Sequence, residues 1–253
     1  MKMIRKMKIS TVSIFPQIFS VLSDYGVTGK ALEKKLIDFT AFDLREFTSD
    51  KHKVTDRPGF GGGAGMVMLI EPFFNFYDYY MKTYSAKPYV VLMSPAGKTF
   101  TNDIARELSQ KDDLVFFCGR YEGIDERINS IVDMELSAGD FVMTGGELPS
   151  MLMIDAISRF IPGVVGDENS VINDSFYDGL LDYPHYTKPA VFRNMTVPEV
   201  LRSGNHKEID LYRKKQSFIN TILKRPDLFI KRELSAEDKK VLVEIITELI
   251  KDA

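Results

Sequence analysis

The stretch GDFVMTGGELPSMLMIDAISRFIPGV, residues 139–164, is the part of the chain around which we interpret the rest. Its pair Gly145-Gly146 can adopt positive φ angles or let a ligand lie against bare backbone. A helix is expected to follow, because Pro149 suits a first turn and apolar residues recur at 151, 154, 157 and 160. A glycine turn that leads into a helix N-terminus can hold a small ligand through main-chain groups. A tight turn before a core helix is the simpler explanation of the glycine pair alone.

Composition places the chain among globular proteins. Its 253 residues suffice for one large or two small domains, with 44% hydrophobic and 27% charged residues. A single cysteine excludes a disulfide framework, and three scattered histidines argue against a transition-metal site. The basic N-terminus lacks the apolar core of a signal peptide, and no apolar run reaches membrane-spanning length. We therefore expect a cytoplasmic protein with no membrane partner.

Charge is distributed unevenly along the chain. The net charge is −3, but residues 202–232 carry nine Lys or Arg and three Asp or Glu, a local balance of +6. The remainder is therefore −9. A basic segment on an acidic protein suggests a polyanionic partner for that segment. A solvated helix face explains the charge equally well.

Short apolar segments alternate with helical patterns in the first part of the chain. Strands are expected at 8–15, 88–94, 113–119 and 132–136, and helices at 66–84, 101–110 and from 147, which indicates an α/β layer with a mainly parallel, buried sheet. Residues 163–175 are polar and aperiodic, as in an interdomain linker. Helices are expected afterwards at 197–203, 206–224 and 235–251. Their proposed buried positions are Ile209, Tyr212, Ile219 and Leu223, then Leu242, Ile245 and Leu249, with a Ser235/Asp238 capping box.

Three glycine-bearing loops follow expected strand ends, at 94–97, 119–123 and 139–146. Ligands of open α/β sheets bind beyond the carboxyl ends of strands. The loops could therefore converge on one ligand and recognise a purine ring through backbone groups. Each loop alone is a weak signal, because βα loops use glycine routinely.

Familiar nucleotide-binding motifs fit poorly. There is no Walker P-loop, and the G-x-G-x-x-A match beginning at Gly59 follows a polar segment in place of a strand. That glycine-rich loop is either a lid that carries Arg57 to a ligand or simply disordered. Asp174 is a lone carboxylate in a polar linker, Arg159 follows the helix of the opening stretch, and Glu122 is either a ligand contact or a surface acid.

Several longer motifs together resemble one family. RPGFGGGAGM (57–66), CGRYEGIDERI (118–128), GDFVMTGGELP (139–149), RFIPGV (159–164), DSFYDGLLDYPHYTKP (174–189) and SGNHKEI (203–209) resemble bacterial tRNA (guanine-N1)-methyltransferases, in the same order, from about residue 7 to 229. The resemblance implies a SPOUT-class α/β domain with a deep trefoil knot (1–162), a linker (163–175), and a small all-helical tRNA-binding domain with an extra C-terminal helix (176–253). It further implies a homodimer with shared active sites that methylates tRNA, and not DNA, at N1 of the guanosine 3′ of the anticodon, using S-adenosylmethionine.

The same resemblance implies roles for individual residues. Asp174 matches the general base, Arg159 the catalytic arginine, and Glu122 a neighbour of a Mg²⁺ ion that assists catalysis. Where the family often has a larger aliphatic residue and Tyr, this chain has Ala138 and Phe141, which should still permit backbone contacts. The implied cofactor contacts are Ser94, Pro95, Gly119, Tyr121, Glu122, Gly123, Ala138, Gly139, Phe141, Met143, Gly145 and Gly146, and the expected substrate contacts are Arg57, Gly59, His185, Arg213 and Lys214.

Two other functions remain open at the level of sequence. Another knotted RNA methyltransferase, acting for instance on a ribose 2′-hydroxyl, would give Asp174 no obvious task. A non-catalytic RNA-binding module would use the basic segment 202–232 alone and would not bind the methyl donor.

Overall fold

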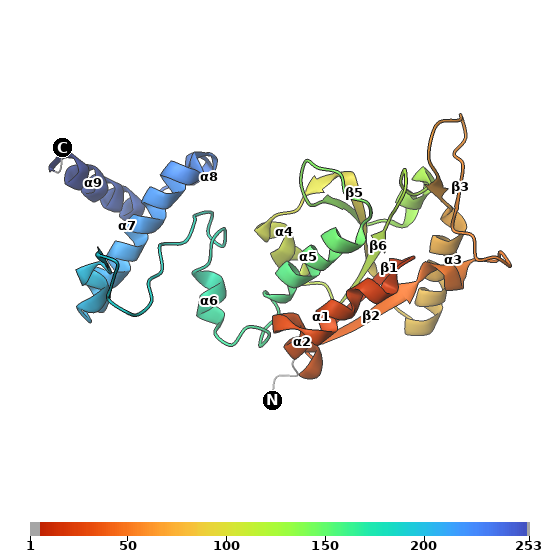
Figure 1. Ribbon diagram of the computed structural model, residues 1–253, viewed down its shortest axis with the longest axis horizontal. Helices are drawn as coiled ribbons and strands as arrows, with labels where there is room; N and C mark the ends of the chain where they lie inside the picture. Colours follow the sequence, from red (N-terminus) through yellow and green to blue (C-terminus); the bar gives the residue numbers. More distant parts are fainter. Residues whose placement is uncertain (1–5, 252–253) are drawn as a thin grey trace. The chain divides into compact units, whose positions relative to one another are not determined.

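The computed structural model describes residues 6–251, except for the side chains of residues 168 and 169 (Figure 1). The chain divides into two compact units, Met1–Glu168 and Asn169–Ala253. The division falls inside the segment 163–175 that the sequence indicates as a linker. The two units are described separately below.

The first unit contains a five-stranded sheet in which every neighbouring pair is parallel, as expected. The strand order is β2-β1-β6-β5-β7. Both faces are covered, and the central strand β6 is buried and apolar from Leu114 to Cys118, as is typical of parallel sheets. The strands are β1 (Met7–Ser13), β2 (Ile37–Asp43), β5 (Tyr89–Thr99), β6 (Asp113–Cys118) and β7 (Met134–Ser137).

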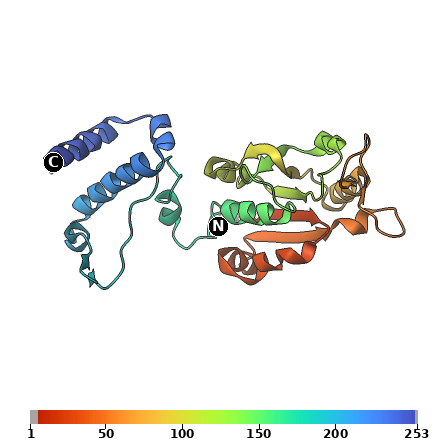
Figure 2. The same ribbon diagram turned by 45° about the horizontal axis from the view of Figure 1, so that its top comes forward.

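Helices lie on both faces of the sheet (Figure 2). Alternate strand residues enter two separate cores, one on each face. Ile9 and Phe116 pack with η1 (Pro16–Phe19), α1 (Ser20–Asp24), α2 (Gly26–Glu33), α4 (Asn102–Leu108) and α5 (Glu147–Ser158). Val12 and Phe117 pack with η2 (Leu44–Phe47), α3 (Ile70–Tyr84) and η3 (Glu126–Ile131). The fully buried Phe73 of α3 belongs to this second core.

Two segments of this unit differ from the sequence-based expectation. The expected helix 66–84 begins only at Ile70, because β4 (Val67–Met68) pairs with β3 (Asp56–Arg57). The glycine-rich segment is thus the connection of a small hairpin. The expected loop 94–97 lies within β5, which continues to Thr99 with a register shift between Met93 and Lys98.

The second unit packs a small core of Leu180, Phe218, Val241 and Ile245. Its helices are α7 (His206–Lys224), α8 (Pro226–Lys231) and α9 (Ala236–Lys251), together with η4 (Glu199–Arg202). The capping box is confirmed: Asp238 N–H donates to Ser235 Oγ, and Ser235 N–H donates to Asp238 Oδ2, both at 3.1 Å.

Three expectations for this second part of the chain need correction. Leu223 and Leu249 are 75% and 63% exposed, and Phe218 and Val241 occupy the core in their place. The unit is not purely helical, since β8 (Val191–Phe192) pairs with β9 (Met195–Thr196). The expected linker also contains a short helix, α6 (Glu168–Ile172).

Two further expectations concern the whole chain. Within residues 6–251, no helix combines the length and the apolar character that crossing a bilayer requires. The trefoil knot that the family resemblance implies stays a prediction.

Candidate functional site

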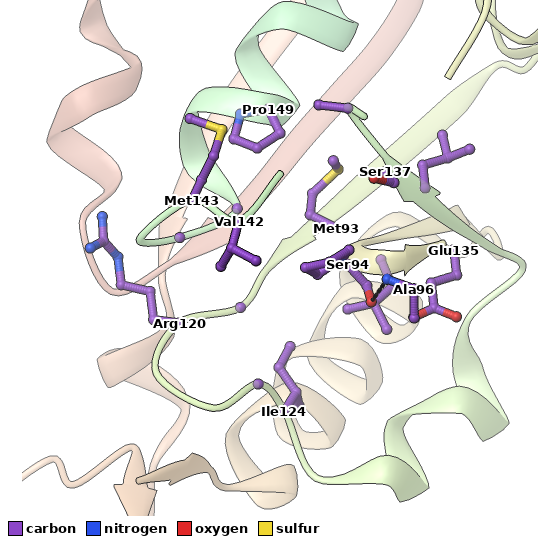
Figure 3. Close-up of a pocket in the computed structure, with 18 of the residues that line it drawn as sticks. Met93, Ser94, Ala96, Arg120, Ile124, Glu135, Ser137, Val142, Met143 and Pro149 are labelled. Carbon is purple, nitrogen blue, oxygen red and sulfur yellow. Dashed lines mark hydrogen bonds between the residues drawn. The ribbon is translucent and has the colours of Figure 1, made fainter. Parts of the chain in front are cut away.

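A cavity of about 410 Å³ lies at the carboxyl ends of β6 and β7 and beside residues 92–96 of β5 in the first unit (Figure 3). This is where ligands bind in open parallel sheets, and the volume lies within the range of small-molecule sites. The three glycine-bearing segments proposed from the sequence all contribute to its wall. Of the twelve expected cofactor contacts, Gly139 alone is absent from the lining; the others are Ser94, Pro95, Gly119, Tyr121, Glu122, Gly123, Ala138, Phe141, Met143, Gly145 and Gly146.

The Gly145-Gly146 pair packs closely against the neighbouring strand and takes no positive φ angle. A Cβ atom on Gly146 would lie 2.9 Å from Cys118 Cα, and Gly146 N–H donates to the carbonyl of Gly119 at 2.9 Å. The two glycines therefore bring the segment before α5 against the end of β6. This close approach is the reason that the two loops share one cavity.

A buried ion pair fastens these two loops together. Arg120 Nε donates to Glu147 Oε1 at 3.1 Å, and Arg120 Nη2 lies 3.1 Å from Glu147 Oε2. The Glu147 side chain is 1% exposed, and Ser13 Oγ of β1 donates to it at 2.5 Å. A carboxylate in the first turn of a helix is favoured by the helix dipole. The sequence interpretation missed this pair, although Arg120 lies inside the glycine motif 119–123 and lines the cavity.

Two further residues show what the cavity can do chemically. Burial raises the pKa of the Cys118 thiol, so this group stays protonated and is a poor nucleophile. Tyr121 has a φ angle of 61°, a left-handed conformation that is costly for a non-glycine residue and is typical of functional loops. Cys118 is fully buried and does not line the cavity, whereas Tyr121 does, so the unusual Tyr121 backbone helps to shape the cavity wall.

Three expected site residues of the first unit lie away from this cavity lining. Arg159 is the exposed C-cap of α5. The first turn of this 12-residue helix borders the cavity, so Arg159 lies roughly 18 Å away, at the opposite end of the helix. Arg57 belongs to β3, and Gly59 follows it in the glycine-rich connection. The hairpin is nevertheless joined to the cavity rim, because Met68 N–H donates to the carbonyl of Gly123 at 2.9 Å.

The second unit brings other expected residues together around a separate cavity of about 350 Å³. Asp174, Arg213 and Lys214 all line it. The Arg213 guanidinium lies 4.9 Å from the ring centre of Tyr183, which also contacts the ring of His185 at 4.8 Å. His185 Nε2 lies 2.8 Å from Asp182 Oδ2.

Acidic residues of α9 contact the basic face of α7. Lys214 pairs with Glu237 at 3.2 Å and with Asp238 at 3.1 Å, while Lys215 pairs with Glu244 and Glu248 at 2.9 and 2.7 Å. Part of the +6 charge of segment 202–232 is therefore neutralised within the same unit. The sequence interpretation did not foresee this arrangement.

No group of three His, Cys, Asp or Glu side chains that could hold a metal ion occurs among the described residues. Glu122 lines the first cavity, as do Glu126 and Glu135, but these carboxylates do not gather into such a group. The protein atoms around it thus do not form a complete site for Mg²⁺.

The parallel sheet and its glycine-walled cavity define an α/β protein that binds a small ligand beyond the carboxyl ends of its strands. Residues 7–231 match the model of the family tRNA (Guanine-1)-methyltransferase TrmD, and the chain belongs to this family. It is 55% identical over 246 residues to a tRNA (guanine-N(1)-)-methyltransferase of Thermosipho africanus, covering 97% of this chain and 99% of that protein. A protein of the same description from Fervidobacterium nodosum is 56% identical over 247 residues, covering 98% and 100%.

A solved structure shows the same similarity. The crystal structure of tRNA (m1G37) methyltransferase from Aquifex aeolicus superposes with a TM-score of 0.72 at 40% identity, and the match covers 89% of this chain and 95% of that one. The family resemblance read from the motifs is confirmed. The sequence relatives align over nearly the full length, so most of the segment after residue 229 is shared with them.

Proposed function

We propose that this protein methylates N1 of the guanosine 3′-adjacent to the tRNA anticodon, with S-adenosylmethionine as the methyl donor. Membership of the family supports the reaction. The single structural observation that carries the proposal is the 410 Å³ cavity, in which three glycine-bearing segments meet at the ends of parallel strands.

The donor site is the first cavity. Its volume suits a nucleoside-sized ligand, and its glycines leave backbone groups accessible for hydrogen bonds to a purine ring. Met143 and Phe141 supply apolar contacts from the third segment. When bound, S-adenosylmethionine supplies an electrophilic methyl group. The Arg120–Glu147 pair holds the two glycine loops at a fixed separation and so orients the bound molecule.

Asp174 is the proposed general base. Guanine N1 carries a proton near neutral pH and must lose it in order to attack a methyl group. General-base assistance is worth about 10²–10⁴-fold in rate. Exclusion of water around the bound RNA would make the carboxylate a stronger base, because burial disfavours its charged form.

Arg159 is proposed to stabilise the negative charge that develops on guanine O6. Its position at the far end of α5 argues that it acts on a substrate held at a partner's donor cavity, which favours a homodimer with shared sites. Exposed apolar side chains on the helices of this unit offer a surface for such a partner. They are Val21, Tyr25, Val27, Leu148 and Leu152.

RNA binding is assigned to the second unit and to the glycine-rich hairpin. Arg213, Lys214 and His185 would contact the RNA backbone, and Arg57 and Gly59 would approach it from the hairpin. The target base must leave its stack to reach the donor. Because Lys214 pairs with Glu237 and Asp238, binding of RNA phosphates there would compete with α9.

Mg²⁺ is not given a step in this mechanism. Magnesium often combines one or two protein carboxylates with substrate phosphates and water. Glu122, Glu126 and Glu135 all line the cavity, but among the described residues they do not form a group that could hold a metal ion. Any magnesium requirement would therefore depend on ligands from the substrate.

The decisive experiment is a methyl-transfer assay on two tRNA transcripts that differ only in carrying G or A next to the anticodon. We expect methylation of the G transcript, with the label recovered as N1-methylguanosine after digestion. Equal methylation of both transcripts, or recovery of a 2′-O-methylated nucleoside, would refute the proposal.

A further inference from the structure

The hairpin connection between β3 and β4 carries an aromatic side chain, Phe60, that is not packed into a core. Phe60 is 106% exposed, more than any other large apolar side chain of residues 6–251. The loop extends away from the sheet beside the β3 label in Figure 1. Exposing a whole phenyl ring to water opposes the hydrophobic effect, by about 2 kcal/mol relative to its burial. A ring held in this way is available to a partner outside the chain.

The backbone around Phe60 permits the ring to be repositioned. Gly61, Gly62 and Gly63 all have positive φ angles, and a Cβ atom on any of them would meet nothing within 4 Å. Open space around them means that packing does not explain these glycines. Their conformational freedom lets the tip adapt to a bound molecule.

The base of the same hairpin is fixed to the donor cavity. Met68 N–H donates to the carbonyl of Gly123 at 2.9 Å, and Glu122 N–H donates to the carbonyl of Met66 at 3.0 Å. Glu122 and Gly123 line the cavity. The adaptable tip is therefore attached to a rigid base at the place where the target nucleotide must arrive.

The charge near the hairpin indicates the kind of partner. Lys51, Lys53 and Arg57 are exposed, and Asp56 is the one acidic residue in the segment 51–57. Lysine and arginine around an accessible aromatic ring are typical of surfaces that bind single-stranded nucleic acid, where the cations contact phosphates and the ring stacks on a base.

We propose that Phe60 stacks on an unpaired RNA base next to the target guanosine. This contact would hold the anticodon loop of the tRNA open while the target guanosine leaves its stack. This inference rests on the proposed function and adds a positioning residue to it. Base-on-aromatic stacking depends on the ring, so tyrosine should replace Phe60 and alanine should not.

The test compares Phe60→Ala with Phe60→Tyr in methyl transfer to a tRNA transcript. Stacking of one base predicts that kcat/KM of Phe60→Ala falls about 5- to 150-fold, with the loss mainly in KM for tRNA, while Phe60→Tyr stays within about threefold of wild type. Binding of S-adenosylmethionine, measured by calorimetry, should be unchanged in both. Unchanged kcat/KM in Phe60→Ala, or an equal loss in Phe60→Tyr, would overturn the inference.

A second measurement identifies the base. Transcripts with an abasic nucleotide on the 5′ or the 3′ side of the target are assayed with wild type and Phe60→Ala. The abasic nucleotide at one of the two positions should reduce wild-type turnover about as much as Phe60→Ala does. The abasic nucleotide and Phe60→Ala together should reduce turnover no further than either change alone. Fully additive losses at both sites would contradict stacking. Failure of wild type to methylate the intact transcript would instead refute the proposed function.

Discussion

The two cavities of this protein are built in different ways. In the first unit, the cavity is shaped by the close approach of neighbouring segments: Gly119, Gly145 and Gly146 line it, and Gly97 packs against the backbone of Leu136. In the second unit, the cavity is walled by charged side chains, among them Asp174, Arg213 and Lys214. A backbone site depends on shape, whereas a charged site depends on individual groups and on pH. Substitutions should therefore separate donor binding from RNA binding and catalysis.

The largest effect is expected for Asp174→Asn, which removes the proposed base and keeps an acceptor for the Ser175 N–H. Turnover on tRNA should fall about 10²–10⁴-fold. Calorimetric binding of S-adenosylmethionine should be unchanged, because Asp174 does not line the first cavity.

The matched control for this experiment is Asp227→Asn. Asp227 is an exposed residue of the same unit that does not line the second cavity, and its ion pair with Arg225 is exposed too, so turnover should stay within about threefold of wild type. If Asp174→Asn turned over normally, or if it lost donor binding, the proposed division of tasks between the two units would be wrong.

The next largest effect is expected for Gly97→Ala in the first unit. Its Cβ atom would lie 2.5 Å from the backbone nitrogen of Leu136, so β5 and β7 would have to separate. Overpacking of this kind costs about 1–3 kcal/mol of unfolding free energy. Because both strands line the cavity, β5 with residues 92–96 and β7 with residues 135–137, the affinity for S-adenosylmethionine should fall at least about tenfold, as measured by calorimetry.

Gly166→Ala is the control for Gly97→Ala. A Cβ atom added to Gly166 would meet no atom within 4 Å, so the melting temperature and the donor affinity of the Gly166→Ala variant should match those of wild type. Normal donor binding by Gly97→Ala would show that backbone approach does not shape the cavity.

The sequence was most informative where the fold depends on the spacing of apolar residues and on the backbone conformations that glycine permits. Buried parallel strands and the bounds of the helix His206–Lys224 follow from apolar runs and helical spacing, and the three loops of the cavity follow from glycine patterns. The eleven individual lining residues were implied by the family resemblance. The β3–β4 hairpin could not be read in this way, because each strand has only two residues. The continuation of β5 past Met93 was equally hidden, since Pro and Gly are typical of loops.

The sequence was least informative about side-chain partners distant along the chain. Helical spacing alone does not distinguish Leu223, which is exposed, from Phe218, which is buried, because α7 meets α9 along only part of its length. The Arg120–Glu147 pair spans 27 residues and depends on the Gly146 contact between two loops. The pairing of Lys214 and Lys215 with α9 likewise depends on tertiary packing.

The smallest effect that we predict tests the charged side of the comparison, at Asp238 of α9. Burial alone would raise the pKa of this carboxyl, but hydrogen bonds from Ser235 and Lys214 outweigh burial and lower it. A lowered folded-state pKa means that the stabilisation is present above the unfolded value of about 4 and is lost as pH falls through the folded value. The second unit should therefore lose stability on acidification below about pH 4.

Asp238→Asn should remove about 1–2 kcal/mol of unfolding free energy from the second unit at neutral pH. It should also abolish that part of the acid dependence, because the neutral amide does not titrate. Amide hydrogen exchange resolved along the chain measures both, and protection should fall in α7 and α9 while the strands of the first unit keep theirs.

Glu237→Gln is the matched control for Asp238→Asn, because Glu237 also pairs with Lys214 but its side chain is 77% exposed. An exposed pair contributes little, so Glu237→Gln should change the unfolding free energy by less than about 0.5 kcal/mol. If the two substitutions lowered the unfolding free energy equally, the buried hydrogen bonds of Asp238 would contribute no more stability than an exposed ion pair. The charged unit would then be no more sensitive to pH than the backbone-built one, and the contrast between the two units would not hold.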